Sequence, residues 1–509
     1  MKSLQFIFFF LLIWSTAKSQ APAVQWQKSL GGSFMEESPD IQQTSDGGYI
    51  VAGASASVNG DVTGNHGNRD FWVVKQDSNG NIQWQKSYGG SGIDKAYSVR
   101  QTTDGGYIIA GGTESNNGDV SGNHGGSDFW IIKTDANGNL QWQKTFGGSG
   151  YDIAQAVRQT TDGGYIVAGI ASSNDGNISG YHGVRDYWVV KTDASGNLQW
   201  QKPLGGESTD EASSIEQTPD GGYIVVGTSS SMGGDITGNH GNGDFWVVKL
   251  NTQGNIQWQK SLGGSNTDKA SAVQPTSDNG YIIAGSSISN NGNVSMNHGN
   301  FDYWIIKLNS TGNLLWEKSY GGSLYDYAFD IKNTSDGGSV VAGYSHSSDR
   351  EGAVSFGAND YWIIKLDPSG YMDWQATFGG LTDDYGKSIQ QTSDGGYVIS
   401  GYSDAITGTP GNYNYWIIKL GGQLDVKETM NMNKISLYPN PAKDFIYIDN
   451  LPTESTVTIT DMSGRTLFSR DYNEKKVSIG TSQLTNGVYI IQATNKKTLI
   501  FSNKLFIKK

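Results

Sequence analysis

A repeat of 58 residues runs through most of the chain and constrains its fold more than any other feature. Two series of tryptophans mark it. The first begins in residues 70–75 (DFWVVK), at Trp72, and returns at positions 130, 188, 246, 304, 362 and 416. The second includes Trp84 in residues 82–86 (IQWQK) and also occupies positions 26, 142, 200, 258, 316 and 374, so that the two series hold 14 of the 15 Trp. Self-similarity at this period is typical of folds that assemble one supersecondary unit many times.

Each repeat offers four short β-like runs and no helical periodicity. In residues 84–141 these runs lie around Trp84, at 97–102, at 107–111 and at 129–133. Glycine-containing turns at 104–106 and 135–139 connect neighbouring runs as tight hairpins, which require a positive φ angle. No connection is long enough for the crossover that parallel strands need. Seven units of four antiparallel strands predict an all-β, seven-bladed β-propeller over residues 22–421.

The two ends of the repeat region indicate how the ring closes. The region begins with a strand of the Trp26 type and ends with a strand of the Trp416 type. If the Trp84-type strand is outermost in its blade, the N-terminal strand completes the last blade and seals the ring. We expect the tryptophans to pack between blades rather than bind a ligand, and Lys75 to pair with a nearby acid.

The predicted connectivity sorts the loops onto two faces. The short turns lie on one face; long loops such as 115–127 and blade-to-blade connections such as 89–95 lie on the other, which we call the long-loop face. There, Asp119 with His124 and Asp235 with His240 are candidate metal ligands. The alternative is that these Asp cap backbone NH groups and the His pack over their own loops. We predict no cofactor, with calcium in these loops as the alternative.

Positions where the repeats differ are the best candidates for a localised function, because catalysis needs groups in unlike environments. Repeat 4 collects Glu207, Glu211 and Glu216. Repeats 6 and 7 lack the loop histidine and add aromatic side chains. The ligand-binding candidates are Tyr325, Tyr327, Phe356, Tyr385 and Tyr413. No Gly-x-Ser-x-Gly or His-Glu-x-x-His motif, phosphate loop or dinucleotide fingerprint is present, so no catalytic residue is assigned.

Charge and targeting signals point to a secreted protein. Residues 1–19 combine Lys2, an apolar run at 6–13 and small residues at 17 and 19, which predicts a signal peptide. No later segment has 18 continuous apolar residues, so we expect no transmembrane segment in the mature chain. Residues 20–421 carry 22 Lys and Arg against 41 Asp and Glu, which argues against a nucleic-acid partner.

After a polar linker at 422–433, residues 434–509 alternate apolar and polar positions, which predicts a small β-sandwich. Four motifs follow one another there: LYPNPA at 437–442, DMSGR at 461–465, LTNGVYII at 484–491 and KLFIKK at 504–509. The segment resembles the type A C-terminal sorting domain of the type IX (Por) secretion system. The residues that carry the resemblance include Tyr438, Pro439, Asn440, Pro441, Gly464, Gly487, Tyr489 and Lys504.

The resemblance implies that the type IX machinery recognises residues 434–509 and exports the protein through the periplasm and the outer membrane. The product would be secreted or held at the cell surface. We predict that the propeller is a binding or adhesion module for a glycan or a surface protein, since near-identical blades favour binding over catalysis. The alternatives are a polysaccharide-acting glycoside hydrolase on a propeller scaffold and a purely structural surface protein.

Overall fold

The structure is a computed structural model that describes residues 20–350, 354–404, 412–422, 435–461, 465–495 and 498–509. The predicted signal peptide and most of the predicted linker lie outside these residues. The chain divides into two compact units, 1–423 and 424–509. Both are built from β-strands, and the described residues contain no helix. The described part of the chain accordingly offers no helix long and apolar enough to span a membrane.

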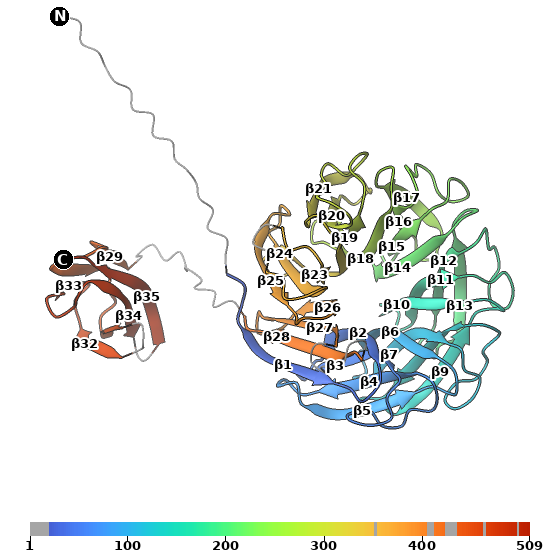
Figure 1. Cartoon of the computed structure of the whole chain (residues 1–509), viewed down its shortest axis with the longest axis horizontal. Coiled ribbons are helices and arrows are strands. Elements are labelled where there is room, and N and C mark those ends of the chain that lie inside the picture. The colour runs from blue at the N-terminus through green and yellow to red at the C-terminus, as the bar shows by residue number, and fades with distance from the viewer. Residues whose placement is uncertain (1–19, 351–353, 405–411, 423–434, 462–464, 496–497) are drawn as a thin grey trace, which may run out of the picture. The chain divides into compact units, whose positions relative to one another are not determined.

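The first unit is a ring of seven four-stranded antiparallel sheets (Figure 1), as the repeat predicts. The innermost strands are β2 (Glu36–Gln43), β6 (Asp94–Gln101), β10 (Ile153–Gln159), β14 (Asp210–Gln217), β18 (Asp268–Pro275), β22 (Asp326–Asn333) and β26 (Asp384–Gln391). The second strands are β3 (Tyr49–Ser55), β7 (Tyr107–Thr113), β11 (Tyr165–Ala171), β15 (Tyr223–Ser229), β19 (Tyr281–Ser287), β23 (Ser339–Ser345) and β27 (Tyr397–Ser403).

The outer half of each blade carries the two tryptophan series. The third strands are β4 (Asp70–Gln76), β8 (Asp128–Thr134), β12 (Asp186–Thr192), β16 (Asp244–Leu250), β20 (Asp302–Leu308), β24 (Asp360–Leu366) and β28 (Asn414–Leu420). The outermost strands are β5 (Ile82–Tyr88), β9 (Leu140–Phe146), β13 (Leu198–Leu204), β17 (Ile256–Leu262), β21 (Leu314–Tyr320), β25 (Met372–Phe378) and β1 (Val24–Leu30). The N-terminal β1 pairs antiparallel with β28, which confirms the predicted closure of the ring.

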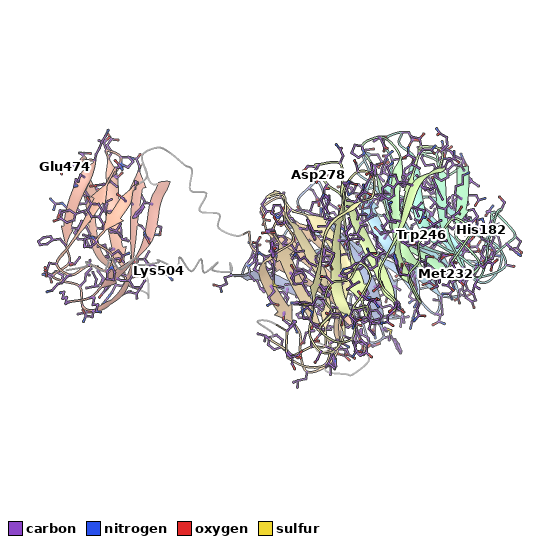
Figure 2. The ribbon with its side chains drawn as sticks, turned by 90° about the horizontal axis from the view of Figure 1, so that it is seen from above. His182, Met232, Trp246, Asp278, Glu474 and Lys504 are labelled. Atoms are coloured by element: carbon purple, nitrogen blue, oxygen red, sulfur yellow. The ribbon has the colours of Figure 1, made fainter. Side chains whose placement is uncertain are left out.

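The core lies between blades, because the third strands are apolar on both faces. Every residue of β8 is buried. The ring of Trp130 packs on Phe71 of the preceding blade at a centroid distance of 4.5 Å, and its indole NH donates to Gln143 at 3.0 Å. Burying such a ring stabilises the fold by roughly 1.5–3 kcal/mol. Figure 2 locates the equivalent Trp246 within its blade. The tryptophans of the first series therefore join blade to blade, as predicted.

An ion pair with the short turn explains why a lysine recurs in the third strand of every repeat. In the 102–106 turn, Gly105 has a φ of 84°, which only glycine adopts at little cost. Asp104 accepts hydrogen bonds from the Gly106 NH at 3.0 Å and from the buried ammonium of Lys133, which lies 2.9 Å from its second oxygen. Lys75 makes the same ion pair with Asp46 at 2.9 Å, which confirms the predicted pairing. Each turn is thereby tied to the third strand of its blade.

The C-terminal unit is a pair of sheets, as predicted. One sheet has the order β29 (Ser436–Tyr438), β30 (Phe445–Asp449), β33 (Lys476–Gly480), and the other β32 (Thr466–Tyr472), β31 (Ser455–Thr460), β34 (Gly487–Asn495), β35 (Thr498–Ile507). Ile448 from the first sheet and Ile491 from the second share one core. Strand β32 is a largely exposed edge strand, so its polar residues show little of the apolar alternation expected from the sequence.

Candidate functional site in the central channel

Each innermost strand carries a β-bulge, with two unpaired residues in β2 and one in each of the other six strands, and the bulge residues line the central channel. In β6 the pairing passes from Ala96 to Ser98 and skips Tyr97, and in β26 it passes from Gly386 to Ser388 and skips Lys387. The irregularity recurs in all seven innermost strands. Bulges re-aim one side chain without ending the strand. The bulge residues that line the channel are Pro39, Tyr97, Gln155, Ser213, Ser271, Phe329 and Lys387.

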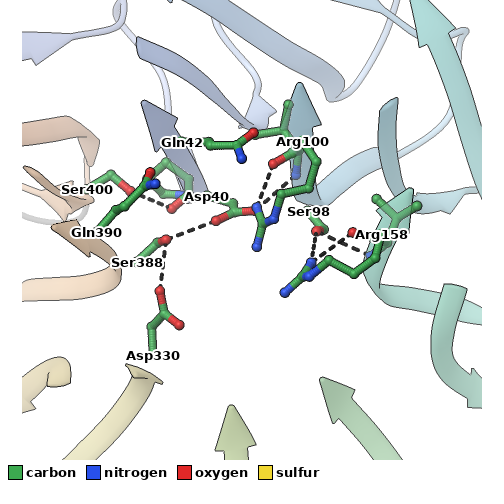
Figure 3. Close-up of polar contacts among 12 residues, drawn as sticks. Asp40, Gln42, Ser98, Arg100, Arg158, Asp330, Ser388, Gln390 and Ser400 are labelled. Atoms are coloured by element: carbon green, nitrogen blue, oxygen red, sulfur yellow. Dashed lines mark hydrogen bonds and ion pairs between the residues drawn. The ribbon is translucent and has the colours of Figure 1, made fainter. Parts of the chain in front are cut away.

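The channel contains a cavity of about 370 Å³. Its lining includes three acidic side chains, Asp40, Glu211 and Asp330, and five basic ones, Arg100, Arg158, Lys269, Lys332 and Lys387. Figure 3 shows Arg100 and Arg158 directed into this space beside Asp40 and Ser388. A cavity of this size with a few convergent charged groups is the usual form of a small-molecule or chain-end binding site.

Ion pairs connect neighbouring blades around the cavity. Arg100 pairs with Asp40, and Arg158 pairs with Glu216 at 2.7 Å. Burial on its own would raise the pKa of Glu216, but the Arg158 guanidinium lowers it below its ordinary value. Arg100 likewise lowers the pKa of Asp40 against the effect of burial. The hydroxyl of Ser388 lies 2.9 Å from Asp40 Oδ1 and 3.1 Å from Asp330 Oδ2, so these charges are held in fixed positions.

Aromatic side chains of blades five to seven form one wall at the long-loop mouth of this channel. Two cross-strand pairs build its centre: Tyr327 faces Tyr344 in the pairing of β22 with β23, and Tyr385 faces Tyr402 in that of β26 with β27. The rings of Tyr344 and Tyr385 meet between blades at 4.9 Å. The members of this aromatic wall are Phe301, Tyr325, Tyr327, Phe329, Tyr344, Tyr385, Tyr402 and Tyr413.

The wall is accessible from outside. Tyr325 is 45% exposed and stacks on Tyr327 with ring planes 6° apart. Tyr327, Tyr385 and Tyr413 are half-buried. The hydroxyl of Tyr327 is protonated at neutral pH and can donate a hydrogen bond, and burial raises its pKa to about 12, further above neutral pH than the ordinary value. Flat ring faces next to hydroxyl donors suit a ligand that is apolar on one side and polar on its edges.

Four of the five ligand-binding candidates thus come together in one wall, and the fifth stands apart. Tyr325, Tyr327, Tyr385 and Tyr413 belong to it, whereas the 47% exposed Phe356 makes no recorded ring contact within the described residues. The backbone NH of Phe356 donates to Asp360 at 2.8 Å. Glu211 of repeat 4 lines the channel and pairs with Arg185.

The metal candidates are engaged by the protein itself. Asp119 accepts from the Gly89 NH at 3.2 Å, and His124 Nδ1 lies 2.6 Å from the buried carboxylate of Asp128. Asp235 accepts from the Gly205 NH at 3.2 Å, and His240 Nδ1 lies 2.6 Å from Asp244. These contacts agree with the alternative stated above, in which the Asp side chains cap backbone NH groups and bind no metal. The described residues hold no group of three or more His, Asp or Glu side chains placed to bind a metal ion.

The bulge residues and the second-strand tyrosines are absent from the sequence predictions. A signal for them exists in the repeat alignment, because the column of Lys387 reads Pro, Tyr, Gln, Ser, Ser, Phe and Lys from blade one to blade seven. The column of Tyr402 reads Ala, Gly, Ile, Thr, Ser, Tyr and Tyr. Such variation inside otherwise uniform strands marks positions at which the blades differ from one another.

In the C-terminal unit, the first and last motifs lie side by side. The Asn440 amide donates to the Lys504 carbonyl at 2.7 Å, and its oxygen accepts from the Phe506 NH at 2.8 Å. The hydroxyl of Tyr438 donates to Asp449 at 2.6 Å, and Pro439 and Pro441 follow cis peptide bonds. Gly487 begins β34, and buried Tyr489 donates to the Thr485 carbonyl at 3.0 Å. Gly464 lies outside the described residues.

Residues 436–508 match the family described as the secretion system C-terminal sorting domain. The C-terminal unit is a type IX sorting domain. The matched range contains three of the four motifs quoted above in full and the fourth as far as residue 508, and it covers nearly the whole of the described part of the unit. The sorting domain directs the protein through the outer membrane to the cell surface or the extracellular space.

Other similarities are weaker. An endo-acting ulvan lyase of Formosa agariphila is 36% identical over 77 residues, which are 14% of this chain and 15% of the lyase. PorZ, a surface component of the type IX secretion system of Porphyromonas gingivalis, is 12% identical over 90% of this chain and 58% of PorZ, with a TM-score of 0.39. A fungal alcohol oxidase of the AA5 family is 12% identical over 96% of this chain and 100% of the oxidase, with a TM-score of 0.44.

Proposed function

We propose that the propeller is a surface-displayed binding module for carbohydrate chains, and that its site is the aromatic wall at the mouth of the central channel. The observation that carries the proposal is the break in symmetry. Blades six and seven have tyrosine both at one position of the innermost strand and at the position that faces it on the second strand. At the second of these positions, blades one to five have Ala54, Gly112, Ile170, Thr228 and Ser286.

The chemistry of the wall supports a sugar ligand. A sugar ring offers CH groups on one face and hydroxyls around its edge, so it stacks on an aromatic ring while its hydroxyls bind polar groups nearby. The hydroxyl of Tyr385 accepts from Asn359 Nδ2 at 3.1 Å, which fixes this ring at the mouth. The half-buried tyrosines lose little conformational freedom on binding because neighbouring rings already restrict them.

The test is glycan binding by the mature chain and its variants. Tyr325→Ala combined with Tyr385→Ala should weaken binding to the best ligand of a glycan array about tenfold or more, since each stacked ring contributes about 0.5–1.5 kcal/mol beyond its buried area. Tyr151→Ala is the matched control, because Tyr151 occupies the repeat position of Tyr325 in another blade and is 58% exposed. Unchanged binding in the double variant, or no glycan bound by the parent, would contradict the proposal.

A polysaccharide-acting enzyme is the second candidate, and the short similarity to an ulvan lyase supports testing it. Incubation with the array ligands and measurement of new reducing or unsaturated ends separates the two functions. Product formation that is lost in Glu211→Gln, which changes an acid of the channel lining, would favour the enzyme. Binding without product favours the module.

A further inference from the structure

The central cavity has a charge opposite to that of the propeller that surrounds it. Its lining carries five basic and three acidic side chains. The propeller as a whole carries 22 Lys and Arg against 41 Asp and Glu in residues 20–421. A local excess of cations inside an acidic unit concentrates anions in the channel and leaves the outer surface repelling them.

Each acid around the cavity already has a cation of its own. Asp40 pairs with Arg100, Asp330 with Lys332, and Glu211 with Arg185. Arg158 is neutralised by Glu216. Lys269 and Lys387 are the two cations of the lining that have no ion-pair partner among the described residues.

Both unpaired lysines lie on the aromatic wall. Lys387 Nζ is 3.4 Å from the ring centroid of Phe329 and 5.7 Å from that of Tyr402. Lys269 Nζ is 5.9 Å from the centroid of Phe301. An aromatic face attracts a cation but leaves the ammonium NH groups free to bind an anion. Both lysines also line the cavity, so their side chains border the same space.

The surroundings of Lys387 do not supply a counter-ion. The charged groups on the flanking strands are Glu36, Glu37 and Asp40 of β2 and Asp326, Asp330 and Lys332 of β22. Glu36 accepts a hydrogen bond from Ser55 at 2.7 Å and Asp326 accepts one from Ser347 at 2.8 Å, while Asp40 and Asp330 have the cations named above. Glu37 attracts Lys387, but its Oε1 already lies 2.6 Å from both Arg69 and Lys95. Burial lowers the pKa of Lys387 to about 8. Desolvation of this kind is relieved when an anion binds beside the ammonium.

We propose that the cavity is an anion subsite, in which Lys387 and Lys269 bind a carboxylate or sulfate group of an acidic glycan chain stacked on the aromatic wall. The inference rests on the proposed carbohydrate-binding function and specifies its ligand class. Tyr327 and Tyr385 hold the sugar ring, and the lysines select chains that carry negative charge. The lysine contacts are charge-assisted hydrogen bonds, which are about twice as strong as neutral ones.

The test compares matched polymers by affinity electrophoresis with the mature chain. Dextran sulfate against dextran tests sulfate, and polygalacturonate against its methyl ester tests carboxylate. Lys387→Met should weaken binding of the preferred charged polymer about tenfold or more and leave that of the neutral polymer unchanged. Lys86→Met removes the same charge from an exposed site on the outermost strand β5 and should have no effect. Parent affinity should fall between pH 7 and pH 9, and that fall should be absent in Lys387→Met.

Three results would overturn the subsite: equal affinity for charged and neutral polymers, equal loss for both in Lys387→Met, or the same pH profile in that variant. Lysine NMR after reductive methylation provides an arm that needs no glycan. Inorganic sulfate should raise the pKa of Lys387, and an unchanged pKa would contradict the inference. A raised pKa without glycan binding would uphold the anion subsite and refute the carbohydrate module, whereas glycan binding indifferent to charge would do the reverse.

Discussion

Closure of the propeller depends on one strand that comes from the far end of the repeat region. Strand β1 pairs with β28 from Val24 to Leu30. Trp26 packs edge-on against Tyr49 of blade one at 5.6 Å, and Trp84 packs against Tyr107 in the same way at 5.8 Å. Trp26→Ala and Trp84→Ala therefore remove equivalent contacts, but only the first lies at the closure of the ring.

The expected loss can be worked from these contacts. Removing a half-buried indole costs roughly 1.5–3 kcal/mol of apolar burial, and the lost aromatic pair adds about 0.5–1.5 kcal/mol. The total of about 2–4.5 kcal/mol corresponds to a roughly 30- to 2000-fold rise in the population of an open state. Strand β5 is connected through the chain to propeller strands at both of its ends, whereas β1 is connected to one only at its C-terminal end, which leads into β2. The loss in Trp26→Ala should therefore appear as local opening between β1 and β28.

Hydrogen–deuterium exchange of peptides from β28 measures this opening. In Trp26→Ala the amides of Ile417 and Lys419, whose strand faces β1, should exchange much faster than in the parent. In Trp84→Ala they should keep the parental rate, and the change should stay near β5 and β4. Parental exchange at β28 in Trp26→Ala, or equal acceleration in both variants, would refute the idea that β1 seals the ring.

Three further outcomes follow from the structure. Deletion of 434–509 should leave a folded propeller in the periplasm, as cell fractionation would show, and surface display of the truncated chain would contradict the role of the sorting domain. Lys133→Met should lower the free energy of unfolding by about 1–3 kcal/mol in denaturant unfolding. It should also raise the pKa of Asp104, because hydrogen bonds from Thr102 and Lys133 hold that pKa at about 2 against the effect of burial. A pKa of Asp104 that carboxyl NMR finds unchanged in the variant would contradict the pairing. Burial raises the pKa of Asp302 and Asp384 to about 6 from an ordinary 3.8, so folding takes up protons between these two pH values. The melting temperature should therefore rise as the pH falls from 7 to about 5. A melting temperature that calorimetry finds to decrease steadily over that range would contradict this prediction.

Much of the fold is predictable because the same pattern of strands and turns occurs seven times in the sequence. The turn glycines, the apolar third strands and the phase of the two ends together require four-stranded blades and a closed ring. The candidate site is less predictable. Tyr325, Tyr327, Tyr385 and Tyr413 stand out as departures from the repeat, but Tyr344, Tyr402 and Phe329 belong to the same wall and carry no motif of their own.

The sequence by itself determined the periodicity, the blade number, the order of the strands and the presence of a sorting domain, because each depends on local pattern and spacing. Only the tertiary structure decided which side chains meet in the channel. Asp40 and Ser388 are 348 positions apart and share a contact because the ring brings blade seven back to blade one. Lys387 faces the cavity because a bulge turns it there, and a bulge depends on pairing with the neighbouring strand, which a single column of residues does not reveal.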